Sequence, residues 1–179
     1  MTDELTTLAL AAGRGDRAAL SEFIRASQAD LWRFLARAVG ADAAEDLAQE
    51  TYLRVLGALP GFEGRSSARS WLFAIARNVV VDLVRREVAR PRLIGMDAAE
   101  LESLAAGRSD SGGRIEVEQA LARLDPERRV ALVLTQLMGF SYAETAEICG
   151  CPVGTVRSRV ARARAELVTG FDRQPVLRS

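Results

Sequence analysis

The residues with the clearest capacity for chemistry are the arginines between positions 157 and 164. A guanidinium group is always charged and presents its N–H donors in a planar fork, which suits phosphate oxygens and the acceptor edge of guanine. At about 100° per residue, Arg157 and Arg162 point away from the apolar face of a helix, and Arg159 and Arg164 lie on its flanks. The spacing therefore predicts a basic helix with two arginines for base edges and two for backbone phosphates.

Small residues lie between these arginines on the outward face, which lets the helix approach a partner closely. The outward small residues are Ser158, Ala161 and Ala165, and the apolar face consists of Val156, Val160, Ala163 and Leu167.

The elements that position this helix are marked in the stretch FSYAETAEICGCPVGTVRSRVARARAEL, residues 140–167. Ser141 and Glu144 have the spacing of a capping box, which starts a helix at Tyr142. Gly150 suits the left-handed residue that ends a helix, and Pro152 suits the first turn of the next. The stretch therefore predicts a helix–turn–helix, whose second helix typically enters the DNA major groove. The alternative is an ordinary solvated basic helix in a small bundle.

Composition favours an all-α protein and excludes several kinds of site. Ala, Leu, Val and Arg dominate, aromatic residues make up 6%, and the chain has no histidine and no lysine. Histidine catalysis is therefore excluded, and Cys149 with Cys151 cannot supply the four ligands of a structural zinc site. We expect no metal, no cofactor and no catalytic residue. The chain lacks an apolar run of membrane-spanning length and a signal-peptide pattern, which predicts a cytoplasmic protein.

The charge is zero overall but unevenly distributed. Residues 61–92 hold seven arginines against three acids, and residues 150–179 hold six against two. Acidic segments precede each of these basic segments, with six arginines against nine acids in residues 1–60 and five against ten in residues 93–149. This distribution predicts two separate contacts with a polyanion.

A helix predicted over residues 43–59 carries a polar stripe that contains one leucine. The stripe includes Asp46, Gln49 and Glu50, with Leu53 among them. An exposed leucine among acids and an amide indicates a protein-docking surface. A solvated face with one ordinary exposed leucine is an equally good interpretation of this helix alone.

A polar loop, residues 62–69, precedes a long helix predicted over residues 70–90. One ridge of that helix holds Trp71, Asn78, Asp82 and Arg85, with Arg77 at its edge. Aromatic rings and guanidinium planes can stack on unpaired bases, so this ridge is a candidate surface for single-stranded DNA. The alternative is that Trp71 belongs to the core and the ridge is solvated.

The remaining pattern predicts helices over residues 5–20, 21–39, 115–124 and 126–138. Glycines and serines over residues 93–113 indicate a flexible linker between two small helical domains. The predicted domains cover residues 1–92 and 114–170, followed by a frayed tail at 171–179.

Three motifs and this linker, in this order, resemble the extracytoplasmic-function (group IV) sigma factors of bacterial RNA polymerase. The motifs are EDLAQETYLRVL at 45–56, SARSWLFAIARNVVVDLVRR at 67–86, and LDPERRVALVLTQLMGFSYAETAEICGCPVGTVRSRVARARAEL at 124–167. The resemblance spans residues 9–167 and is particularly close to the actinobacterial sigma C type in CGCPVGTVRSRVARAR. It implies a sigma-2 domain, a linker and a sigma-4 domain, without sigma-1.1 or sigma-3.

The resemblance also implies a role for each matching residue. Polymerase binding falls on Asp46, Gln49, Glu50 and Leu53. Contacts with the −10 element fall on Trp71, Arg77, Asn78, Asp82 and Arg85, and on Phe62, Arg65 and Ser66 of the loop. Contacts with the −35 element fall on Arg157, Ser158, Ala161 and Arg162, with phosphate contacts from Thr155, Arg159 and Arg164. Some family members have a bulky residue where this chain has Ala161, so a contact surface is missing there.

The implied partners are promoter DNA and core RNA polymerase, held through the β′ clamp helices by sigma-2 and the β flap by sigma-4. An anti-sigma factor is a further partner that the family allows. Without core polymerase we expect the two domains to have no fixed spacing and to bind promoters poorly. Two rivals remain: a helix–turn–helix regulator that binds DNA without polymerase, and a nucleic-acid enzyme built on the acids at positions 42–50.

Overall fold

The computed structural model describes residues 3–89 and 112–172, and the side chains within 3–86 and 117–169. The regular structure of these residues is entirely helical, which confirms the predicted all-α class. The predicted linker, 93–113, lies outside the described residues except Gly112 and Gly113, which begin a helix. Most of the predicted tail, 171–179, lies outside them too.

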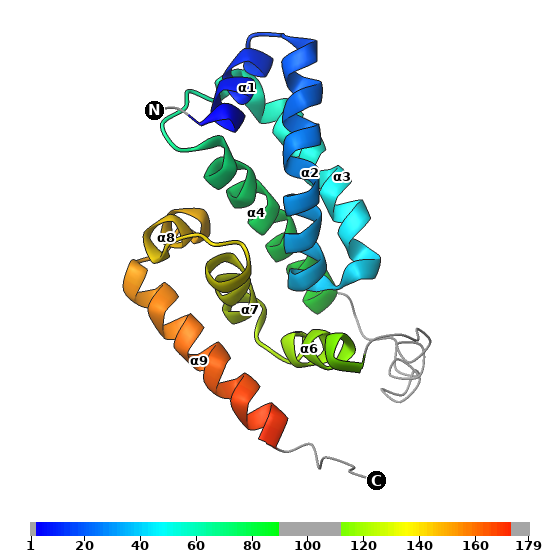
Figure 1. Cartoon of the computed structure of the whole chain (residues 1–179), viewed down its shortest axis with the longest axis vertical. Helices are drawn as coiled ribbons and strands as arrows, with labels where there is room; N and C mark the ends of the chain where they lie inside the picture. Colours follow the sequence, from blue (N-terminus) through cyan, green and yellow to red (C-terminus); the bar gives the residue numbers. More distant parts are fainter. Residues whose placement is uncertain (1–2, 90–111, 173–179) are drawn as a thin grey trace.

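The helices form an N-terminal and a C-terminal group (Figure 1). The N-terminal group contains α1 (Glu4–Gly13), α2 (Arg17–Val39), α3 (Ala41–Ala58), the short 3-10 turn η1 (Leu59–Gly61) and α4 (Ala68–Ala89). The C-terminal group contains α6 (Gly112–Ala122), α7 (Pro126–Leu132), the π-helical turn η2 (Val133–Leu137), α8 (Tyr142–Cys149) and α9 (Val153–Asp172).

The first helix boundary differs from the prediction. The helix predicted over residues 5–20 ends at Gly13, and α2 begins at Arg17. Asp16 causes the break, because its carboxylate accepts hydrogen bonds from the amides of Ala18 and Ala19 and so caps α2. Glycine is also the only residue type that fits at position 13, because a Cβ there would lie 2.5 Å from the carbonyl oxygen of Leu59.

Helix α1 fixes the start of α4. The hydroxyl of Thr6, which is buried, accepts a 2.8 Å hydrogen bond from the amide of Ala68. Ser67 adds a second restraint, because its hydroxyl accepts from the amide of Ser70. The loop before α4 is therefore held at its end by a buried contact from a helix more than sixty residues away in the chain.

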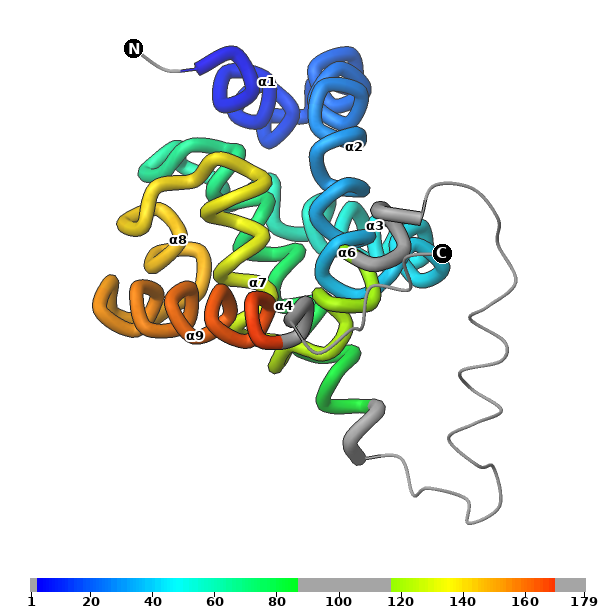
Figure 2. The backbone as a smooth tube through the Cα atoms, turned by 60° about the horizontal axis from the view of Figure 1, so that its bottom comes forward, coloured from blue at the N-terminus to red at the C-terminus, as the bar shows by residue number. Residues whose placement is uncertain are grey.

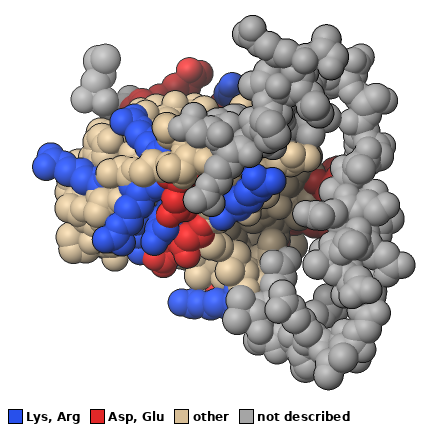
Figure 3. Space-filling view, turned by 90° about the horizontal axis from the view of Figure 1, so that it is seen from below, with Lys and Arg blue, Asp and Glu red and all other residues tan. Residues whose placement is uncertain are grey.

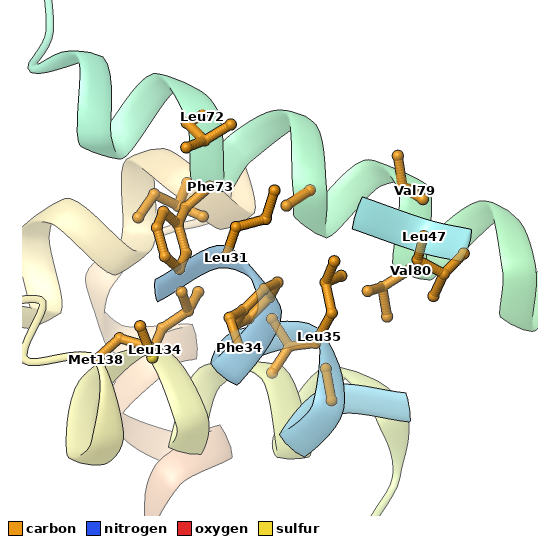
Figure 4. Close-up of a cluster of buried hydrophobic side chains, with 14 of the residues drawn as sticks. Leu31, Phe34, Leu35, Leu47, Leu72, Phe73, Val79, Val80, Leu134 and Met138 are labelled. Carbon is orange, nitrogen blue, oxygen red and sulfur yellow. The ribbon is translucent and has the colours of Figure 1, made fainter. Parts of the chain in front are cut away.

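The larger hydrophobic core joins the two groups of helices. Leu31 and Phe34 of α2 and Phe73 of α4 converge with Leu134 and Met138 from the region of η2 (Figure 4). All five side chains are at most 8% exposed. A second, smaller core lies within the C-terminal group and includes Val156, Val160 and Ala163 of α9.

Helix α4 lies beside α7 and α8 in both views of the backbone (Figures 1 and 2). The Phe73 and Phe140 rings meet edge to face, with centroids 5.0 Å apart. Arg129 of α7 also reaches the end of α2, where it donates a 2.9 Å hydrogen bond to the carbonyl oxygen of Ala38. The two groups therefore pack directly together in this structure. The expectation that the two domains have no fixed spacing without core polymerase stays a prediction.

Candidate nucleic-acid interface

The turn of the predicted helix–turn–helix has the expected local chemistry. The Ser141 hydroxyl accepts from the Glu144 amide at 3.1 Å, and the Glu144 carboxylate accepts from the Ser141 amide at 2.8 Å. Hydrogen bonding to the Glu144 carboxylate, from the Ser141 side chain first and from the Ser141 amide second, lowers the pKa of Glu144 below its usual value. Gly150 ends α8 in the left-handed conformation with φ 61°, as glycine at this position allows. The capping box and the glycine stop are both confirmed.

Helix α9 separates an apolar side from a basic side as its spacing predicts. Val156, Val160 and Ala163 are at most 1% exposed. The exposed residues on the other side include Arg157, Ser158, Ala161, Arg162 and Arg164. The opposite face of the helix is anchored in the smaller core, so these side chains are held on a rigid support. That arrangement matches the way a recognition helix presents side chains to base edges.

Two of the predicted phosphate contacts on α9 are less accessible. Thr155 is half-buried, and Arg159 keeps only 19% of its side chain exposed. Arg159 pairs with the carboxylate of Glu127 and approaches the Cys151 sulfur at 3.5 Å. Arg164, although exposed, donates to the side-chain oxygen of Gln136. Arg159 must therefore exchange an existing partner before it can bind a phosphate.

The ridge of α4 is divided between solvent and the C-terminal helices. Asn78 and Arg85 are exposed, whereas Arg77 keeps 19% of its side chain exposed. Trp71 is half-buried and packs against Phe62, with ring centroids 4.7 Å apart. Trp71 is thus a rim residue, and the alternative that placed it in the core is only partly correct. The loop residues Arg65 and Ser66 are exposed.

Asp82 links the ridge of α4 to the polar stripe of α3. Arg54 donates a 2.8 Å hydrogen bond to Asp82 and a second hydrogen bond, of 2.5 Å, to Glu50. The bond from Arg54 lowers the pKa of Asp82 below its usual value. The side chains predicted for two different partners, Asp82 for DNA and Glu50 for polymerase, therefore share one guanidinium.

The polar stripe of α3 presents an apolar side chain to solvent. Leu53 is 70% exposed, and Asp46 and Gln49 beside it are exposed. Glu50 is half-buried through its bonds with Arg54. A leucine this exposed is held away from the core by the register of α3, in which Leu47, Thr51 and Val55 are the buried positions.

Two charged residues make contacts between the groups of helices that the sequence did not indicate. Arg69, at the start of α4, donates a 2.6 Å hydrogen bond to the carbonyl oxygen of Met138 and lies 4.2 Å above the Phe140 ring. Glu127, near the start of α7, contacts both Arg159 and Arg77. One sequence feature could have indicated these contacts. The apolar side of α4 that includes Phe73 and Val80 is wide enough to need a second packing surface, besides the N-terminal helices.

The two cysteines are reduced and packed at the turn. Cys149 is 6% exposed, and burial with the nearby Cys151 raises its pKa to about 11. In the described part of the chain, no group of three His, Cys, Asp or Glu side chains could hold a metal ion. No helix among those residues is both long and apolar enough to cross a membrane.

Basic and acidic side chains lie side by side on the face seen from below, where arginines gather around a small acidic patch (Figure 3). The fold and this surface define a two-part helical protein with a basic helix–turn–helix, a class that binds DNA.

Comparison with known proteins is consistent with that class. Residues 23–90 match the family model described as Sigma-70 region 2, and residues 114–167 match the one described as Sigma-70, region 4. The chain is 50% identical over 169 residues to the ECF RNA polymerase sigma factor SigC of Mycobacterium tuberculosis, covering 93% of this chain and 90% of that protein.

Two solved structures are similar in fold and sequence. One is CnrH in complex with the cytosolic domain of CnrY, with a TM-score of 0.72, 29% identity, and coverage of 97% of this chain and 100% of that one. The other is the sigma factor RpoE in complex with the anti-sigma factor NepR from Bartonella quintana, with a TM-score of 0.67, 27% identity, and coverage of 87% and 98%. The chain therefore belongs to the extracytoplasmic-function sigma factors of the sigma-70 family. Members of this family are transcription initiation factors and not enzymes.

Proposed function

We propose that this chain binds core RNA polymerase and directs it to promoters through two DNA-reading surfaces. Helix α9 reads the −35 duplex, with Arg157, Ser158 and Arg162 at the base edges. The observation that carries the proposal is the exposure of these side chains on a helix whose opposite face is buried. Ala161 contributes a close approach rather than a contact, and phosphate contacts come from Thr155, Arg159 and Arg164.

The second reader is the start and ridge of α4 with the loop before it. Asn78 and Arg85 are already exposed there, and Trp71 with Phe62 forms an aromatic pair at the rim. Arg65, Ser66, Arg77 and Asp82 complete the −10 surface. A surface that binds the unpaired strand more tightly than the duplex shifts the equilibrium towards open DNA, and the difference between the two affinities limits that shift.

The polar stripe of α3 supplies the main polymerase contact. Leu53 presents apolar area among Asp46, Gln49 and Glu50, and this combination suits the β′ clamp helices. The C-terminal domain, residues 114–170, contacts the β flap, and both contacts form in the cytoplasm where polymerase works. The complex of the similar RpoE with NepR supports an anti-sigma factor as a further partner of this chain.

A DNA-binding assay with and without core polymerase tests this function. The holoenzyme should bind and melt promoter fragments that the free chain binds poorly. Tight, sequence-specific promoter binding by the free chain would instead indicate a polymerase-independent regulator.

A further inference from the structure

One carboxylate lies between the two DNA-reading helices. Glu127 is the second residue of α7, after Pro126, and its side chain keeps 51% of its area exposed. It pairs with Arg159 of α9 through one oxygen and lies 3.9 Å from Arg77 of α4 through the other. Each of these arginines keeps only 19% of its side chain exposed, so water screens their charges little. Glu127 is the carboxylate that neutralises them.

The other charged groups at this place have different tasks. A cavity of about 220 Å³ lies between α4 and α7, and Glu127 and the two arginines line it. Asp125 and Arg85 line this cavity as well. The Asp125 carboxylate accepts from the amides of Glu127 and Arg128 and so caps α7. Arg85 is exposed on the outer rim. Glu127 is therefore the carboxylate that is placed to hold both arginines.

A guanidinium binds carboxylate and phosphate with the same donor geometry. Arg159 gives donors of this kind to Glu127, and Arg77 lies 3.9 Å from the same carboxylate, beyond hydrogen-bond distance, so a phosphate must compete with Glu127 for the charge of both arginines. Arg159 belongs to the proposed −35 surface and Arg77 to the proposed −10 surface, so one side chain competes at both.

We propose that Glu127 is an intramolecular substitute for DNA phosphate that occupies one arginine of each DNA-reading surface in the free chain. The inference rests on the proposed function, because it takes both arginines as DNA contacts. The Arg77 contact breaks when α4 and α7 move apart, as spacing the two readers along a promoter requires. The Arg159 contact lies within the C-terminal group, and there the phosphate displaces the carboxylate directly.

The test compares the full-length wild type with Glu127→Gln, which keeps the shape of the side chain and removes its charge. The matched control is Glu166→Gln, which removes the same charge from α9, where Glu166 pairs with Arg128. Fluorescence anisotropy would follow binding to a random-sequence duplex and to an oligothymidine strand, since phosphate contacts need no particular sequence. The salt concentration would run from about 50 to about 200 mM.

Glu127→Gln should bind both probes roughly two- to fivefold more tightly than wild type, the range that releasing a partly exposed ion pair allows. The dependence of log affinity on log salt should steepen by about 0.9 on the duplex and about 0.7 on the single strand, one phosphate contact each. Adding Arg77→Gln to Glu127→Gln should remove the gain on the single strand. Circular dichroism would confirm that each variant is folded.

Unchanged affinities and salt slopes for folded Glu127→Gln would overturn the proposal. An equal gain in affinity for Glu166→Gln would also overturn it, because the gain would then come from the change in net charge and not from a specific competitor. Transcription by wild type with core polymerase distinguishes a failure of the Glu127 proposal from a failure of the proposed function. If wild type supports transcription while Glu127→Gln gains nothing, only the role of Glu127 fails. If wild type neither binds core polymerase nor supports transcription, the proposed function fails.

Discussion

Replacing Leu53 by aspartate should separate polymerase binding from folding. Leu53 is 70% exposed, so the folded chain loses little buried area, and we expect the free energy of unfolding to change by about 0.5 kcal/mol or less. Full burial of a leucine contributes about 1.5–3 kcal/mol, and seven-tenths of that is roughly 1–2 kcal/mol at an interface. An unpaired aspartate carboxylate at the same contact adds a penalty of about 1–3 kcal/mol.

The sum, about 2–5 kcal/mol, weakens the affinity for core polymerase by at least about 30-fold. The assay is titration of fluorescently labelled full-length chain with core polymerase, together with urea unfolding of the free chain. Ala26→Asp is the matched control, because it adds the same charge at an exposed position of α2, outside the proposed polymerase contacts. Core binding by Leu53→Asp at the wild-type level would refute the docking role, and an equal loss in both variants would show that the effect is not specific to α3.

Three further substitutions test the DNA-reading surface and its supports. Arg162→Ala should weaken promoter binding by the holoenzyme by about 1–3 kcal/mol if the arginine makes a bidentate base contact, and unchanged promoter use in transcription assays would remove it from the site. Thr6→Val should lower the free energy of unfolding by about 1–3 kcal/mol, because the Ala68 amide loses its buried acceptor. Thr7→Val, at an exposed site, should change it by less than about 0.5 kcal/mol. Equal urea midpoints for the two variants would contradict this prediction. Because folding lowers the pKa of Glu144, its charge stabilises the fold above the usual glutamate pKa of about 4.3 and loses that effect as the pH falls through the lowered value. The stability difference between wild type and Glu144→Ala should therefore shrink in acid, and a difference that stays constant down to about pH 2 would count against the capping bond.

The locally encoded features of the fold could be predicted from the sequence. Ser141 with Glu144 caps α8, and Gly150 ends it, because each depends only on residues within one turn of the chain. The exposed and buried sides of α9 also follow from its period alone. The same reasoning located the exposed Leu53 on α3, where the helical register turns it away from the buried positions Leu47, Thr51 and Val55.

The contacts between the two groups of helices could not be predicted in this way. Arg69 reaches the Met138 carbonyl, and Arg129 reaches the Ala38 carbonyl, over sequence separations that no local pattern encodes. The apolar surface of α4 is wide, and its pattern alone does not say which neighbours cover it. Its two sides pack against the N-terminal helices and against α7 and α8, which also explains why Arg77 is covered.

The central proposal is that this chain directs polymerase to promoters. The direct measurement is run-off transcription with core polymerase on genomic fragments, with the wild-type chain added or omitted, followed by mapping of the start sites. We predict new transcripts that require the chain and begin downstream of one shared pair of −35 and −10 sequences. Start sites that are unchanged by the chain, with core polymerase shown to be active using another sigma factor, would contradict the account.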